Sequence, residues 1–427
     1  MAKPIRVVAL VAVASLGLAA CGGSSSGGSS TGGSGAGSGG GKTVTISTDL
    51  PLQGAQKDDS AATNNLIDLY LSQHGYKAGA YTIKFDKYDN STAAKGQWDD
   101  AQCQSNATKH VATTSEVAVM GTFNSGCAKI ELPVLNQDPD GPMLMVSHAN
   151  TNPGLTKAWD ANEPAKYYPA GSRNYARVIV TDDFQGSAAA KFAATKLNVK
   201  KVYVLNDNQT YGQGVAKAFV AAAAQNGIQI LGNEAWDAKQ QSYAPLFNKI
   251  KAMNPDMIYL SGIIDSNGPA LIKDKVAVLG KNDGVKLMGP DGMTGTKVDT
   301  LPEAEGMYLT FGGKPIDQIL KSGGPAADLL NAYKSKYGSL PGSSYALYAV
   351  GAVQVILAAI AKSDGTRKGV TQQVFSGTGI TIGADTSATG NQIQIDPKTG
   401  DSIGGVMTVL HLTGGKENFL ESNPVGS

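Results

Sequence analysis

The stretch EVAVMGTFNSGCAKIELPVLNQ, residues 116–137, reads as a strand, a turn and a helix. EVAVMG is an apolar run that is typical of a buried strand. The small and polar residues that follow predict a turn, and CAKIELPVLNQ predicts a helix. GPMLMVS, residues 141–147, then begins another strand. Strands separated by helices indicate an α/β fold with parallel sheets.

The same alternation of strands and helices runs outward from this stretch along the chain. It occupies residues 43–175 and then starts again after residue 182. Two such runs predict two doubly wound parallel-sheet lobes with several hinge crossings between them. We expect hinges near Val180–Asp183 and Leu309–Gly313, with a third crossing in the last strands. The expected boundaries of lobe 1 are 43–181 and 312–390, and those of lobe 2 are 182–311 and 391–427.

The first 42 residues predict export and anchoring. Lys3 and Arg6 precede an apolar run, residues 7–18, and LAAC then ends at Cys21. This pattern is that of a secretory signal, and it resembles the bacterial lipobox, in which the cysteine is lipidated. Residues 22–42 are almost entirely Gly and Ser, which predicts a flexible tether. We therefore expect a lipid-anchored protein on the extracytoplasmic face of a bacterial cell membrane; the alternative is an ordinary signal peptide with an incidental cysteine.

Cysteine usage agrees with export. If Cys21 is lipidated, only Cys103 and Cys127 remain, and an isolated pair outside the cytoplasm usually forms a disulfide. A metal site formed by this pair and His110 is the alternative, but the spacing matches no strong zinc pattern. We expect the disulfide and no metal.

Three other readings are disfavoured by the sequence. The formal net charge of +1 provides no basic field for nucleic acid. AGSGGGKT, residues 36–43, matches a loose phosphate-loop pattern, but it lacks the preceding strand and the following helix that phosphate binding needs. The apolar run at 345–361 contains Gln354 and two tyrosines, so we expect a buried helix and not a membrane span. No cofactor is expected.

Two strand ends predict an anion site. Ser125 lies where a helix begins, and the first amides of a helix carry partial positive charge and lack internal partners. VSHANTNPGLT, residues 146–156, is a similar strand end with small polar residues, including Thr151. Because carboxyl ends of parallel strands share one edge of a sheet, these groups should meet at a ligand carboxylate.

Several motifs occur in an order that resembles the bacterial branched-chain amino-acid-binding proteins, a family with the type I periplasmic binding fold. They span essentially all of the chain after the tether: GTFNSGCAKIELPVLNQ (121–137), MLMVSHANTNPGLT (143–156), DDFQG (182–186), VLNDNQTYGQG (204–214), MGPDG (288–292), AEGMYLT (304–310) and YALYAVGAVQV (345–355). The resemblance implies a solute-binding protein of an ABC importer.

The resemblance also implies roles for individual residues. Ser125, Thr151 and the backbone of Ala149 would hold a ligand carboxylate, Tyr211 would close from the other lobe, and Asp291 would hold an ammonium group. The chain departs from the family in the side-chain pocket, at LPLQGAQKDDS (50–60) and at Ile263–Ile264. The weaker candidates for ligand contact are Gln53, Asp58, Asn124 and Ile264.

The predicted function is therefore capture of an amino acid or a related small carboxylate for ABC permease subunits by a monomeric lipoprotein. An enzyme would need Ser125 or Cys127 with a base, for which His148 is the nearest candidate, and no orienting carboxylate is evident. A ligand-sensing module that feeds a receptor is a second alternative. Binding of an amide or an aromatic acid is a third.

Overall fold

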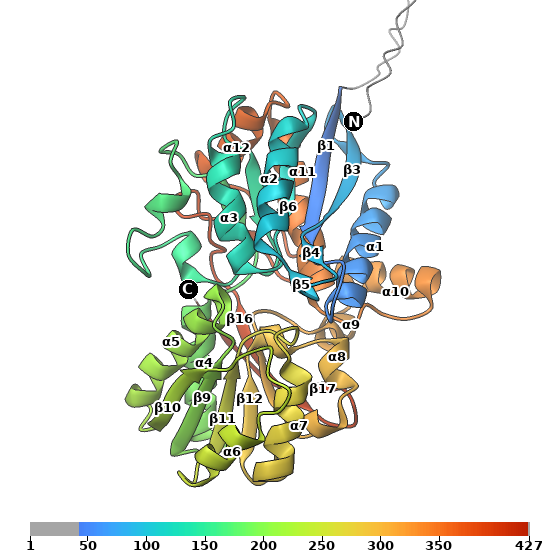
Figure 1. Ribbon diagram of the computed structural model, residues 1–427. Helices are drawn as coiled ribbons and strands as arrows, with labels where there is room; N and C mark the ends of the chain where they lie inside the picture. Colours follow the sequence, from blue (N-terminus) through green and yellow to red (C-terminus); the bar gives the residue numbers. More distant parts are fainter. Residues whose placement is uncertain (1–41, 426–427) are drawn as a thin grey trace, which may run out of the picture. The chain divides into compact units, whose positions relative to one another are not determined.

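The structure is a computed structural model, and it describes residues 42–425. The predictions for Cys21 and for the tether up to residue 41 lie outside the described residues. The fold contains two large sheets with helices around each of them (Figure 1). The predicted α/β class with two doubly wound, mainly parallel sheets is confirmed.

The first sheet has the strand order β2-β3-β1-β6-β7-β8. Its strands are parallel except for the short edge strand β2. Helices α2 and α3 pack against each other, and α1 packs against α11. The bounds are β1 Thr43–Leu50, α1 Lys57–Gln73, β2 Lys77–Ala78, β3 Tyr81–Asp89, α2 Asp100–Ala112, β6 Glu116–Gly121, α3 Ser125–Asn136, β7 Leu144–Ser147, β8 Tyr175–Arg177, α10 Pro325–Tyr337, α11 Tyr345–Lys362 and α12 Arg367–Phe375.

The second sheet has the order β10-β9-β11-β12-β13-β16-β17, with the last two strands antiparallel. Its helices pack in the pairs α4 with α5 and α6 with α7. The bounds are α4 Asp182–Thr195, β9 Lys201–Asn206, α5 Thr210–Gln225, β10 Gln229–Ala235, α6 Ala244–Lys251, β11 Met257–Ser261, α7 Gly268–Leu279, β12 Lys286–Gly289, α8 Thr296–Asp299, β13 Tyr308–Phe311, α9 Ile316–Ser322, β16 Val406–Leu412 and β17 Glu417–Pro424.

Short elements complete the fold. β4 (Ser91–Thr92) pairs with β5 (Gln97–Trp98), and β14 (Thr381–Ile382) pairs with β15 (Ile393–Gln394). The single-turn helices are η1 Pro153–Leu155, η2 Ala165–Tyr167, η3 Asp291–Met293 and η4 Pro302–Ala304.

The two sheets share one topology. In the first sheet β1 lies between β3 and β6, and in the second sheet β9 lies between β10 and β11. The order β3-β1-β6-β7-β8 in the first sheet corresponds to β10-β9-β11-β12-β13 in the second. Beside β1 and beside β9, the spatial order of the strands reverses relative to their order along the chain. In open α/β sheets, ligands bind in the crevices at such points.

The chain passes between the sheets at 178–181, at 312–315 and at 395–405. The first two crossings include residues 180–181 and 312–313 of the predicted hinges, whereas the other predicted positions lie in α4 and β13. Rotation at these crossings stays a prediction. The crossings pack closely, because a Cβ at Gly312 would lie 3.4 Å from Val180 Cβ, and one at Gly405 would lie 2.6 Å from Val180 Cγ2. Small residues at 312 and 405 allow this approach.

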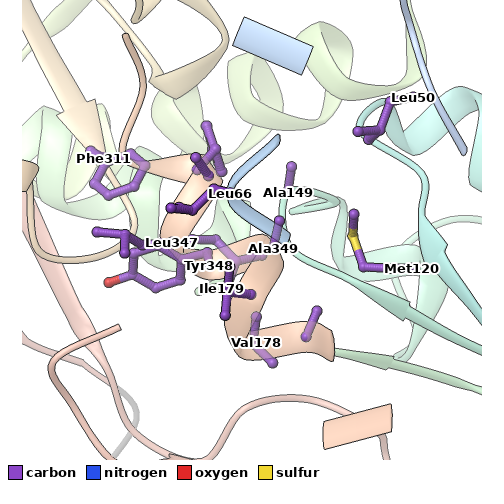
Figure 2. Packing of buried hydrophobic residues seen from close by; sticks show 14 of the residues in the cluster. Leu50, Leu66, Met120, Ala149, Val178, Ile179, Phe311, Leu347, Tyr348 and Ala349 are labelled. Carbon is purple, nitrogen blue, oxygen red and sulfur yellow. The ribbon is translucent and has the colours of Figure 1, made fainter. Parts of the chain in front are cut away.

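Helix α11 supplies much of the core near these crossings. Among the described residues it is the one helix long and apolar enough to cross a membrane, yet 78% of its apolar window is buried inside the fold. Figure 2 shows Leu347, Tyr348 and Ala349 of α11 in one buried cluster with Val178 and Ile179 of the first crossing. The prediction of a buried helix at 345–361 is confirmed.

Candidate functional site

A small cavity lies where the strand ends of the two sheets meet. Its volume is about 20 Å³, which is enough for about one water molecule. Larger hollows elsewhere on the described surface are more open to solvent, and they do not lie at the points beside β1 and β9 where the strand order reverses. We therefore place the site at the small cavity. The residues that line it are Phe123, Asn124, Ser125, Ala149, Tyr211, Ile263, Asp291, Gly292 and Tyr345.

The first sheet contributes hydrogen-bond donors. Ser125 is the first residue of α3, and it is buried. Its Oγ lies 3.4 Å from the amide of Asn152, so the helix start and the segment after β7 lie together. The Thr151 hydroxyl is buried and has no hydrogen-bond partner among the described residues. This edge is therefore suited to a carboxylate, since it combines two hydroxyls with the partial positive charge of a helix start.

The second sheet contributes a carboxylate. Asp291 begins η3 directly after β12, and the hydroxyls of Tyr211 and Tyr345 both hydrogen-bond to it. The Tyr211 hydroxyl also accepts a hydrogen bond of 2.9 Å from the amide of Gly292. Burial raises the pKa of Asp291, and the two tyrosine hydroxyls oppose that rise.

Glycine is required at position 292. A Cβ there would lie 2.6 Å from the Tyr211 ring and 2.7 Å from the carbonyl of Gly262. Any larger residue would push Tyr211 away from Asp291. Sequence reasoning included Tyr211 and Asp291, but it quoted Tyr345 only as part of a motif.

Sequence reasoning missed Asp182. This residue begins α4 after the first crossing, it is fully buried, and neither carboxylate oxygen has a hydrogen-bond partner among the described residues. Its pKa is raised well above the ordinary value, mainly by burial and then by the charge of Asp291. Asp182 stood in the motif DDFQG, but an acidic residue at a helix start has an ordinary explanation in the helix dipole, so it was not singled out.

The four weaker candidates differ in whether they line the cavity. Asn124 lines the cavity, whereas Ile264 is buried beside it, and its neighbour Ile263 forms the wall. Gln53 hydrogen-bonds to Asp89 through Nε2, at 2.9 Å from Oδ2, and Asp58 is exposed on α1. Neither side chain is among those that line the cavity.

Cys103 on α2 and Cys127 on α3 lie together where these two helices pack. Their Sγ atoms are 1.98 Å apart, and both residues are fully buried. Glu131, one turn further along α3, places Oε1 3.2 Å from Cys127 Sγ. Burial and the neighbouring Asp49 raise the pKa of Glu131.

Asp49, His110 and Glu131 have side-chain types that hold metals, and they are close enough to share an ion. However, His110 Nε2 lies 3.2 Å from Asp49 and Nδ1 lies 2.8 Å from Glu116. Burial alone would lower the pKa of His110, but these two carboxylates raise it to about 9. His110 is thus an imidazolium between two carboxylates, and this arrangement is complete without a metal.

The comparisons with known proteins agree with this architecture. A family model described as periplasmic binding protein matches residues 43–399. An amino acid binding protein of Pseudomonas aeruginosa is 25% identical over 281 residues, which are 65% of this chain and 67% of that protein. A Leu/Ile/Val-binding protein of Rhizobium johnstonii is 28% identical over 57% of this chain and 60% of its own length. Most of the curated relatives are thus matched over less than two thirds of their length.

Solved structures share the fold at low identity. A leucine-binding protein of Thermotoga maritima has a TM-score of 0.72 at 21% identity, covering 89% of this chain and 98% of that one. A solute-binding protein of Rhodopseudomonas palustris in complex with p-hydroxybenzoic acid has a TM-score of 0.73 at 17% identity, covering 90% and 98%. These relatives and neighbours are solute-binding proteins and not enzymes. Because the family model spans most of the chain, this protein belongs to the periplasmic binding protein family, and its relatives are of the Leu/Ile/Val-binding type.

Proposed function

We propose that this protein captures an α-amino acid outside the cytoplasm and delivers it to the permease subunits of an ABC importer. The observation that supports this most is the distribution of charge around the cavity. The Ser125 hydroxyl and a helix start line the cavity on one side, and the Asp291 carboxylate lines it on the other. A second buried carboxylate, Asp182, lies beside Thr151, whose carbonyl accepts a hydrogen bond of 3.0 Å from the Asp182 amide. A zwitterion complements such a site.

In this proposal the ligand carboxylate is bound by the hydroxyls of Ser125 and Thr151, the α3 start and the backbone at Ala149. The ammonium group lies between Asp182 and Asp291. Hydrogen bonds to charged groups contribute about 1.5–3 kcal/mol each. An ammonium group also removes the repulsion between two carboxylates that have no counter-ion of their own.

Binding requires movement, because a cavity of about 20 Å³ is too small for an amino acid. The solute enters when the lobes separate at the crossings near 180–183 and 309–313, and closure then buries it. Contacts across the cleft favour the closed form: Trp98 Nε1 donates to Gln209 Oε1 at 2.8 Å, and the amide of Ala55 donates to Asp265 Oδ1 at 2.5 Å.

The rest of the expected organisation belongs to the same proposal. Cys21 carries the lipid, residues 22–42 form the tether, and a Cys103–Cys127 disulfide stabilises lobe 1. The Sγ distance of 1.98 Å supports the disulfide. The protein acts as a monomer whose two lobes, with the boundaries given above, both face the permease when closed.

Calorimetry on matched ligands tests the function. Amino acids are compared with analogues that lack only the ammonium group, such as leucine with 4-methylpentanoate. We expect at least one amino acid to bind about 100-fold more tightly than its analogue, because the analogue leaves Asp182 and Asp291 unpaired. Equal binding of such a pair would contradict the proposal.

Capture of an aromatic acid is a second candidate, because Phe123 and Tyr345 form aromatic walls of the cavity. The R. palustris neighbour that holds p-hydroxybenzoic acid shows that the fold accepts such a ligand. The two buried carboxylates disfavour an anion that carries no cation. Including benzoate and 4-hydroxybenzoate in the same calorimetry distinguishes the two candidates.

A further inference from the structure

His148 lies directly after β7, between Ser147 and Ala149, and is almost completely buried. Its ring packs edge-on against Phe123, at 5.7 Å between centroids, and against Tyr345, at 5.9 Å. Both of these rings line the cavity. His148 therefore lies immediately behind two of the cavity walls.

Neither ring nitrogen of His148 has a hydrogen-bond partner among residues 42–425. Burial lowers its pKa to about 3, so the ring is neutral at physiological pH. A neutral imidazole carries one donor and one acceptor, and leaving both unmet in a buried place is unfavourable. Such a group calls for an explanation.

Asn124 shows the same feature at the cavity surface. It precedes α3 at the position where asparagine commonly caps a helix, yet its side chain makes no capping hydrogen bond. Its Oδ1 is buried and has no partner in the described part of the chain. The side chain lines the cavity next to Phe123.

We propose that His148 and Asn124 form a polar subsite that selects amino acids with an uncharged hydroxyl or carboxamide side chain. This inference rests on the proposed function, in which Ser125, Thr151, Asp182 and Asp291 hold the ligand's charged groups. The two ring nitrogens of His148 and Oδ1 of Asn124 then remain available to hydrogen-bond with the ligand side chain. A hydroxyl or carboxamide both donates and accepts, as this pair requires.

The location of the subsite follows from the size of the cavity. An amino acid enters only after the lobes separate, and the rings of Phe123 and Tyr345 both line the cavity and pack against His148. In this inference the two rings shift around the bound solute, and the imidazole then reaches the ligand side chain. Because the imidazole is neutral, the subsite offers no counter-ion for a carboxylate or ammonium side chain.

Isosteric ligand pairs test the subsite on the unmodified protein. Threonine is compared with valine, and asparagine with leucine, by calorimetry. At least one polar member should bind about ten-fold or more tightly than its apolar partner, because a site built for hydrogen bonds rejects the analogue that lacks them. Equal or tighter binding of valine and leucine would overturn the subsite and leave the proposed function standing. If no amino acid bound while simple carboxylates did, both the polar subsite and the proposed function would be overturned.

Variants assign the selectivity to named residues. His148→Phe keeps an aromatic ring and removes both nitrogens, so the polar-to-apolar preference should fall about ten-fold or more, and His148→Gln should restore part of it. Asn124→Ala should weaken the polar ligand about three- to ten-fold. The matched control is His411→Phe on β16, whose ring stacks on Tyr308 and does not line the cavity. An unchanged preference in a folded His148→Phe protein would contradict the assignment.

Discussion

The protein buries two groups of carboxylates, and the two groups differ in what neutralises them. In the first sheet, Asp49 and Glu116 flank His110, which is charged because their hydrogen bonds raise its pKa to about 9. Near the cavity, burial raises the pKa values of Asp182 and Asp291, and the charge of Asp291 raises that of Asp182 further. Among the described residues neither carboxylate forms a salt bridge. The nearby Arg177 is paired with Asp401 at 2.7 Å.

This difference separates a structural group from a binding group. A buried charge is tolerated when it is paired and hydrogen-bonded, and it is costly otherwise. The His110 group includes its own counter-ion, so its charges are balanced when the chain folds. The Asp182–Asp291 pair lacks one, and in the proposed function the ligand provides the positive charge. Substitutions in the first group should therefore affect stability, and those in the second should affect affinity.

The largest expected effect is the loss of His110. His110→Ala leaves Asp49 and Glu116 without a counter-ion in a fully buried place, which should destabilise the protein by about 3–5 kcal/mol. Ligand affinity of the folded fraction should change less than about three-fold. Denaturant unfolding and calorimetry measure the two quantities. His74→Ala, at an exposed histidine at the end of α1, is the control and should change neither.

The pH dependence of stability sharpens the same assignment. The pKa of His110 is raised from 6.5 to about 9, so its stabilisation is fully present below pH 6.5 and is lost as the pH rises through 9. A shift of this size corresponds to about 3 kcal/mol. The raised pKa of Glu131 changes stability in the same direction. Unfolding curves between pH 6 and 10 should show this decline, and a flat profile would contradict the charged His110.

The two cysteines lie beside the His110 group and should also affect stability alone. Their bond would close a loop with a sequence separation of 24 residues, which predicts about 3 kcal/mol of stabilisation in the chain-entropy model. Replacing both with serine should lower the unfolding free energy by roughly that amount. Intact-mass measurement of protein from an oxidising compartment provides the direct check: two free thiols would rule out the bond.

At the cavity, Asp291→Asn and Asp182→Asn should each weaken the best amino acid about ten- to several-hundred-fold, because each removes a charge-assisted contact with the ammonium group. Analogues without the ammonium group should lose much less. Stability should not fall for Asp182→Asn, since a buried carboxylate with a raised pKa is itself unfavourable at neutral pH. A large loss of stability with unchanged affinity would place Asp182 in the structural group instead.

The sequence was informative where a residue's chemistry and its place on a strand end agreed. Ser125, Ala149, Tyr211 and Asp291 line one cavity, because the parallel strands that precede them end at facing edges. Asp182 was not predictable, because its burial depends on how α4 packs against α5, where a Cβ at Gly214 would lie 3.5 Å from Asp182 Oδ2, and no local pattern records that packing. Tyr345 was hidden inside an apolar helix, where most residues serve the core.

The smallest expected effect concerns the polar residues after β1, which were candidates because LPLQGAQKDDS, residues 50–60, departs from the family's pattern in the side-chain pocket. Asp58 is exposed in the first turn of α1, where a negative charge favours the helix start without touching the cavity. Asp58→Ala should therefore change ligand affinity less than about two-fold and should lower stability by no more than about 1 kcal/mol. Gln53→Ala is a matched variant with a partly buried partner, because Gln53 hydrogen-bonds to Asp89. If Asp58→Ala weakened binding more than ten-fold, while Gln53→Ala did not, the ligand side chain would extend to α1 and carry a positive charge.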